Sequence, residues 1–63
     1  MNQDVNVCVE LKYDTDKAYL IFDGDVSVWI PKSQVRKMER LANSEEAWEM
    51  TMPEWLAHKS GLI

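Results

Sequence analysis

The chain has 63 residues, a net charge of −4 and 46% hydrophobic residues, which fits one folded domain, 1–63, and is too apolar for a disordered segment. It has no run of about 18 apolar residues, so a membrane span is excluded. Met1–Asp4 lacks the basic and apolar parts of a signal peptide. The single cysteine, Cys8, cannot form an internal disulfide. We therefore expect a cytoplasmic protein.

The first predicted element is a strand over residues 5–13, because polar residues alternate there with Val5, Val7, Val9, Leu11 and Tyr13. A period of two is typical of a half-buried strand. We expect Cys8 within it to be a small, partly buried side chain without special reactivity. Asp14-Thr15-Asp16 then predicts a turn in which short polar side chains bond the backbone.

Two more strands are predicted before the middle of the chain. Ala18–Phe22 is a continuous apolar run, which fits a central strand covered on both faces. Asp23-Gly24 predicts a tight hairpin, since this dipeptide tolerates positive φ. Residues 26–30 alternate as a third strand, and Pro31 ends it because proline cannot donate to a ladder.

Residues 33–42 fit two structures. Ser33 could cap a helix, or the same segment could form a strand. The helix would have an apolar stripe made of Val35, Met38, Leu41 and Ala42. Residues 43–46 then break the pattern as a loop, and the alternation from Trp48 to Met52 predicts a further strand.

The end of the chain predicts a short helix. Thr51 and Glu54 have the spacing of a capping box, and Gly61 suits a left-handed closing residue. Because so short a helix is unstable alone, it must dock on the sheet, and Trp55 should be its buried anchor. The predicted structural anchors are Thr51, Pro53, Glu54, Trp55, Leu56, Gly61 and Leu62.

Together these elements predict a β-rich α+β fold. It consists of a small antiparallel sheet of four to five strands, arranged as a meander or a partly closed barrel. One short C-terminal helix near residues 52–60 completes it.

The sequence predicts no catalytic residue, metal or cofactor. One cysteine and one histidine are too few for a structural zinc site. Two glycines provide no Gly-rich phosphate loop. His58 is best explained as a solvated residue near a helix C-terminus.

The candidate binding residues come from charge and aromatic content. Residues 1–31 carry a net charge of −4, whereas residues 32–63 are neutral overall and contain a basic cluster interrupted by Glu39. This cluster is either a solvated face or a patch for acidic protein or phosphate. Trp29 is out of phase with its apolar neighbours, so it either covers the second sheet face or is exposed. The candidates are Trp29, Lys32, Arg36, Lys37 and Arg40.

Two stretches, Val28–Val35 (VWIPKSQV) and Met52–Ile63 (MPEWLAHKSGLI), resemble a family of short hypothetical proteins of bacteriophages and prophages. In that family a W-[IL]-P-K-S-Q-[IV] strand end precedes a terminal P-E-W-L-A-x-K-x-G-L. Asp23-Gly24-Asp25 matches an acidic turn that commonly precedes the tryptophan, and the resemblance covers most of residues 10–63. It implies a cytoplasmic phage-derived protein without an assigned reaction, and a strand over residues 34–41 that runs into a hairpin.

The sequence leaves two functions open. The first is a non-catalytic phage-derived accessory protein that binds and modulates, or inhibits, a host or phage protein of nucleic-acid metabolism or defence. An acidic half suits competition for a surface that holds DNA. The second is a small nucleic-acid binding module in which Arg36, Lys37 and Arg40 contact phosphate and Trp29 stacks on bases. Neither function needs a membrane, and the partner's identity and the oligomeric state lie beyond the sequence.

Overall fold

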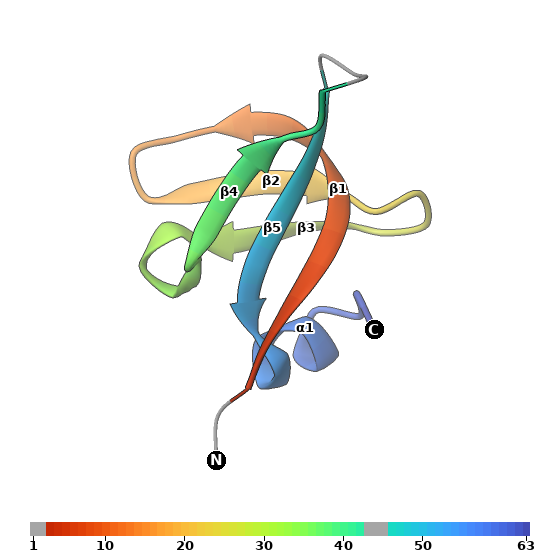
Figure 1. Cartoon of the computed structure of the whole chain (residues 1–63). Coiled ribbons are helices and arrows are strands. Elements are labelled where there is room, and N and C mark those ends of the chain that lie inside the picture. The colour runs from red at the N-terminus through yellow and green to blue at the C-terminus, as the bar shows by residue number, and fades with distance from the viewer. Residues whose placement is uncertain (1–2, 43–45) are drawn as a thin grey trace.

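The computed structural model describes residues 3–42 and 46–63. Residues 1–2 and 43–45, which include the start of the chain and most of the predicted loop at 43–46, lie outside the described residues. Five strands, one 3-10 helix and one α-helix follow in the order β1 (Asp4–Asp14), β2 (Ala18–Phe22), β3 (Ser27–Pro31), η1 (Lys32–Gln34), β4 (Lys37–Arg40), β5 (Ala47–Pro53) and α1 (Glu54–Lys59) (Figure 1). The β-rich fold with a short C-terminal helix is confirmed.

The strands form one antiparallel sheet in the order β3-β2-β1-β5-β4. β1, β2 and β3 make a meander, and the hairpin of β4 and β5 joins the far side of β1 through β5. Figure 1 shows the long strands β1 and β5 side by side, with β4 crossing in front of β2. The sheet therefore curls without closing into a barrel, and β3 and β4 remain its two edges.

Alternate residues along each strand separate a core face from an outer face. The core face packs around the buried residues Val9, Ile21, Ile30, Met50, Met52, Leu56 and Ala57. Met38 of the edge strand β4 also packs against this core, so the sheet folds over its own apolar face. The outer face is the side turned away from this core, and it carries Cys8, Tyr13, Leu20, Trp29 and Glu49.

The turn between β2 and β3 is the hairpin that Asp23-Gly24 predicts. The Asp23 Oδ1 atom accepts hydrogen bonds from the backbone N–H groups of Asp25 and Val26, each at 2.8 Å. Gly24 has φ 103°, a conformation that glycine adopts at little cost. A carboxylate and a glycine therefore fix the register of these two strands.

The segment at residues 33–42 resolves into η1 followed by β4. The strand interpretation is confirmed for Lys37–Arg40, which pairs with β5 as a hairpin, and the helix alternative is wrong. The Arg36 N–H donates to the Thr51 carbonyl at 2.8 Å, which directs the chain from η1 into the sheet. This contact joins residues distant in sequence, so periodicity alone could not choose between strand and helix.

The predicted capping box is wrong. β5 extends to Pro53, and the helix has Pro53 as its N-cap with no side-chain capping bond. The Thr51 hydroxyl instead donates to Asn6 Oδ1 at 2.6 Å. Pairing of β1 with β5 continues as far as Asp4 opposite Pro53. That pairing keeps Thr51 extended and directs its side chain across to β1 rather than toward Glu54.

The prediction that Trp55 is a buried anchor is also wrong, since 49% of its surface is exposed. Leu56 and Ala57 dock the helix, with exposures of 7% and 0%. The physical reason is the position of each residue around the helix axis. α1 begins at Glu54, two residues later than predicted, and Leu56 and Ala57 face the sheet while Trp55 faces solvent. At the helix end Gly61 has φ 79°, and the Leu62 N–H donates to the Ala57 carbonyl at 2.8 Å, as expected for the closing turn.

Two further expectations fail on the outer face. Cys8 is exposed rather than partly buried, because it alternates with the core residue Val9 and so faces outward. β2 has a neighbouring strand on each side, with β1 rather than β2 at the centre of the sheet, and only its core face is covered. Ile21 is fully buried, whereas Leu20 and Phe22 on the opposite face are half-buried.

Candidate functional site

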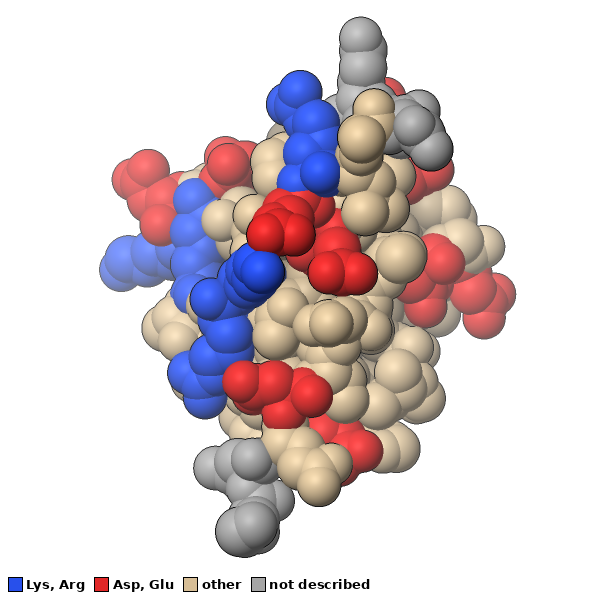
Figure 2. All heavy atoms as spheres, viewed as in Figure 1, with Lys and Arg blue, Asp and Glu red and all other residues tan. Residues whose placement is uncertain are grey.

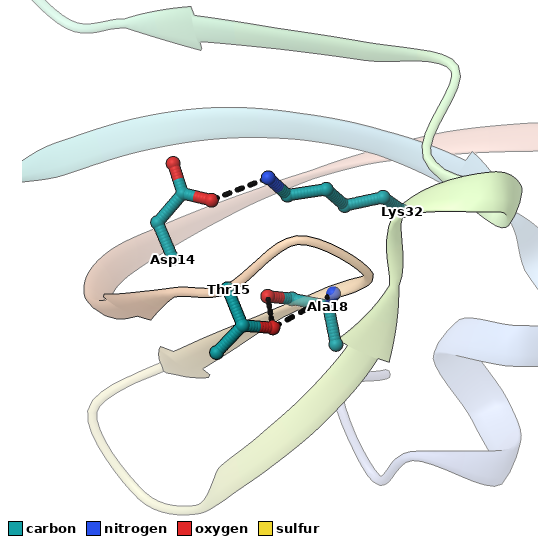
Figure 3. Close-up of polar contacts among 4 residues, drawn as sticks. All are labelled: Asp14, Thr15, Ala18 and Lys32. Carbon is teal, nitrogen blue, oxygen red and sulfur yellow. Dashed lines mark hydrogen bonds and ion pairs between the residues drawn. The ribbon is translucent and has the colours of Figure 1, made fainter.

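Lys32 is the predicted binding residue that lies in η1. Its Nζ atom is 2.5 Å from Asp14 Oδ1 and 4.8 Å from the centroid of the Tyr19 ring. Figure 3 shows this ion pair beside the turn between β1 and β2, where the Thr15 hydroxyl donates to the Ala18 carbonyl and accepts from the Ala18 N–H. The Asp14 carboxylate raises the pKa of Lys32. Lys32 therefore ties η1 to this turn.

The other three predicted basic residues lie on or next to β4. Figure 2 shows Lys and Arg side chains along this part of the surface, with acidic side chains between them. Their partners are Asp4 Oδ1 for Arg36 Nε (3.6 Å), Glu39 for Lys37 (2.9 Å) and the Trp48 ring for Arg40 (5.4 Å to the centroid). The Glu39 carboxylate also raises the pKa of Lys37. The basic cluster is thus a mixed-charge surface, not an uncompensated positive patch.

Trp29 does not lie with these residues. It stands on the outer face opposite Leu20, which in turn stands opposite Tyr13, so three neighbouring strands align three large side chains. Tyr13 is 65% exposed and Trp29 is 53% exposed, while Leu20 is half-buried between them. We call Tyr13, Leu20 and Trp29 the aromatic row.

The sequence pattern misses the aromatic row because of an irregularity in β1. Strand alternation places Tyr13 on the core face with Leu11. The register shifts between these two residues, so that Leu11 stands opposite the buried Ile21 and Tyr13 opposite Leu20. A β-bulge of this kind re-aims the following side chain. Only the out-of-phase Trp29 signals the row in the sequence.

A shallow hollow on the outer face lies at the other end of β2. Its volume is about 180 Å³, and its lining comprises Cys8, Val9, Glu10, Phe22, Asp23, Gly24 and Ala47. The Lys12 Nζ atom is 2.8 Å from Glu10 and 5.6 Å from the centroid of the Phe22 ring. Its pKa is raised by the Glu10 carboxylate. On the outer face, the Lys12 ammonium group therefore lies over the Phe22 ring.

Acidic turns lie at both ends of β2. Asp14 and Asp16 belong to the turn next to Tyr13, and Asp23 and Asp25 to the turn next to the hollow. Figure 2 shows acidic side chains on the two opposite sides where these turns project in Figure 1. The backbone N–H groups of Val26 and Asp25 lower the pKa of Asp23, which keeps it anionic. The aromatic row therefore lies between two turns that carry aspartate side chains.

Comparison of the chain with protein-family models, curated proteins and solved structures finds no match. The resemblance to the phage family stays a prediction. Within residues 3–42 and 46–63, no three Cys, His, Asp or Glu side chains lie close enough to hold a metal ion. In the same part of the chain, no helix is both long and apolar enough to cross a membrane.

Proposed function

We propose that this protein is a non-catalytic accessory protein of phage origin that binds a host or phage protein through the outer face of β1, β2 and β3. The observation that supports this proposal is the aromatic row. Tyr13 and Trp29 each leave more than half of their surface in contact with solvent. Tyrosine and tryptophan are among the residues that contribute most at protein interfaces.

The position of the row on paired strands strengthens the proposal. Backbone pairing holds Tyr13, Leu20 and Trp29 in one line before any partner arrives. Binding by such a surface loses less conformational entropy than binding by a loop, because the anchors are already placed. Large side chains on an uncovered face of so small a domain add little to its own stability.

The charges around the row indicate the class of partner. Four aspartates in the two turns surround it, and the nearby cations are Lys12, Lys17 and Lys32, of which Lys32 pairs with Asp14. An acidic surface speeds association with a basic one and disfavours an acidic one. Surfaces that hold DNA or RNA are basic. We therefore propose that the partner is a protein of nucleic-acid metabolism or defence, and that binding modulates or inhibits it by competing with its nucleic acid.

Direct nucleic-acid binding is the second candidate, because an exposed Trp29 could stack on a base. The charges favour the first proposal over this one. Lys32, Arg36 and Lys37 each face a carboxylate, and the turns near Trp29 are acidic. Phosphate binding needs a net positive field.

The test is partner capture from a native host, followed by affinity measurement with the purified partner. Trp29→Ala and Tyr13→Ala should weaken binding at least tenfold. Trp55→Ala is the matched control, since Trp55 is equally exposed but lies outside the row. Loss of binding in the control, or tight and steeply salt-dependent binding of single-stranded oligonucleotides by the parent, would contradict the proposal.

A further inference from the structure

The hydrogen-bond pattern between β2 and β3 determines which backbone groups of the edge strand β3 point away from the sheet. The Asp23 N–H donates to the Val26 carbonyl at 3.1 Å, and the Lys32 N–H donates to the Lys17 carbonyl at 2.8 Å. These contacts fix the hydrogen-bonded positions at the two ends of the β2–β3 ladder. Bonded and non-bonded pairs alternate in an antiparallel ladder. Every second residue of β3, beginning with Ser27, therefore directs its N–H and C=O away from β2.

This free edge consists of Ser27, Trp29 and Pro31. Among the described strands β3 pairs only with β2, and no turn or loop of the described chain bonds to its outward groups. Pro31 occupies an outward position, where its missing N–H costs no internal hydrogen bond. Ser27 and Trp29 thus offer both donors and acceptors.

The other edge of the sheet is protected in a way that β3 is not. Three of the four residues of β4 are charged, whereas β3 contains no charged residue. Charged side chains on edge strands hinder pairing with another chain. The contrast indicates that pairing is prevented along β4 and left open along β3.

We propose that a second copy of the chain pairs antiparallel with β3, independently of the partner bound by the aromatic row. In the proposed register Ser27 of each copy lies opposite Trp29 of the other. Each of these two pairs exchanges two backbone hydrogen bonds, so all outward groups of Ser27 and Trp29 are satisfied. Pro31 lies outside the bonded part of this ladder.

The side chains and charges fit the same register. The small Ser27 of one copy lies beneath the Trp29 ring of the other, because opposite residues of an antiparallel pair share a face. Antiparallel pairing also places Lys32, at the end of one β3, near the acidic Asp23–Asp25 turn of the second copy. Lys32 also contacts Asp14 of its own copy, so it lies between that carboxylate and the Asp23–Asp25 turn of the second copy. Both aromatic rows then lie on the same side of one continuous sheet.

The first test compares Ser27→Pro with Ser27→Ala by sedimentation equilibrium. The Ser27 N–H points outward, so proline removes the intermolecular donor without loss of an internal bond. The parent and Ser27→Ala should double in mass as concentration rises. Ser27→Pro should associate at least tenfold more weakly. A parent that is monomeric at millimolar concentration, or a Ser27→Pro variant that dimerises like the parent, would overturn the proposal.

The second test uses the parent alone and so does not depend on the folding of a variant. Hydrogen exchange at the Ser27 and Trp29 amides should slow at least tenfold between dilute and concentrated protein. Met38 and Arg40 are the internal controls, because their amides face outward from β4. Their exchange should not change with concentration. Protection that appears on β4, or no concentration dependence on β3, would exclude this dimer.

Discussion

The two faces of the sheet come from the same strands but differ in how much of their apolar surface is covered. On the core face Ile21, Ile30 and Met50 are fully buried, and α1 adds Leu56 to them. On the outer face apolar side chains of comparable size remain in contact with water. The difference shows that apolar content in this chain is not a measure of its core. The core face maintains the fold, whereas Tyr13 and Trp29 on the outer face remain exposed.

The largest expected effect is a difference in the free energy of unfolding between substitutions at Ile30 and at Trp29, which are neighbours in β3. Ile30→Ala should lower the free energy of unfolding by about 2–5 kcal/mol, because the removed side chain is fully buried. Trp29→Ala, one residue earlier but on the outer face, should lower it by less than about 1 kcal/mol. Urea melts of both variants measure this contrast. Equal losses would mean that the aromatic row is structural.

A second and smaller contrast concerns α1. Leu56→Ala should cost about 2–3 kcal/mol, because this side chain docks the helix on the core. Trp55→Ala should cost less than about 1 kcal/mol, since half of its surface is already exposed. Thermal melts monitored by circular dichroism distinguish the two variants. A larger loss for Trp55→Ala than for Leu56→Ala would show that the helix docks in a different phase.

Lowering the pH should destabilise the turn between β2 and β3, which contains Asp23. The depressed pKa of Asp23 stabilises the folded state above the ordinary carboxyl pKa of about 4, and this contribution disappears as pH falls through the folded value. Asp23→Asn keeps the acceptor for the Asp25 and Val26 amides but does not titrate. Below about pH 4 the parent should lose stability more steeply than this variant. Parallel pH profiles of the melting temperature would contradict the assignment.

The smallest expected effect concerns the basic cluster. Arg36→Glu combined with Arg40→Glu should change the free energy of unfolding by less than about 1 kcal/mol, because exposed ion pairs contribute little. Partner affinity should change less than threefold, since neither residue belongs to the aromatic row. Loss of partner binding at an unchanged melting temperature would transfer the binding role to β4.

Local patterns predict the strands but not their arrangement. Alternation in β1 and β5 and the Asp23-Gly24 turn are properties of short segments, and the structure confirms them. Insertion of β5 between β1 and β4 depends on pairing between distant segments, which periodicity does not encode. A meander interpretation therefore describes only β1 to β3.

The candidate site was predictable only in part, for similar reasons. Trp29 stands out because it breaks phase with its neighbours, but Tyr13 joins it through a bulge without a local signal. The basic cluster is conspicuous in sequence, but the acids that offset it include Asp4 and Asp14, which are distant in the chain. A run of like charges in the sequence overestimates the net charge of a surface patch when folding places residues of opposite charge beside it.

The central pairing of β1 with β5 also affects how the chain folds. Glu10 pairs with Ala47 and Asp4 with Pro53, so these partners are separated by more than half of the chain. Closing so long a segment costs entropy before its contacts form, which slows folding compared with a helical domain of this size. During synthesis β1 can pair with β2 early, but its other side must wait until residues 47–53 leave the ribosome. Until then a nascent chain exposes one side of an 11-residue strand to its neighbours.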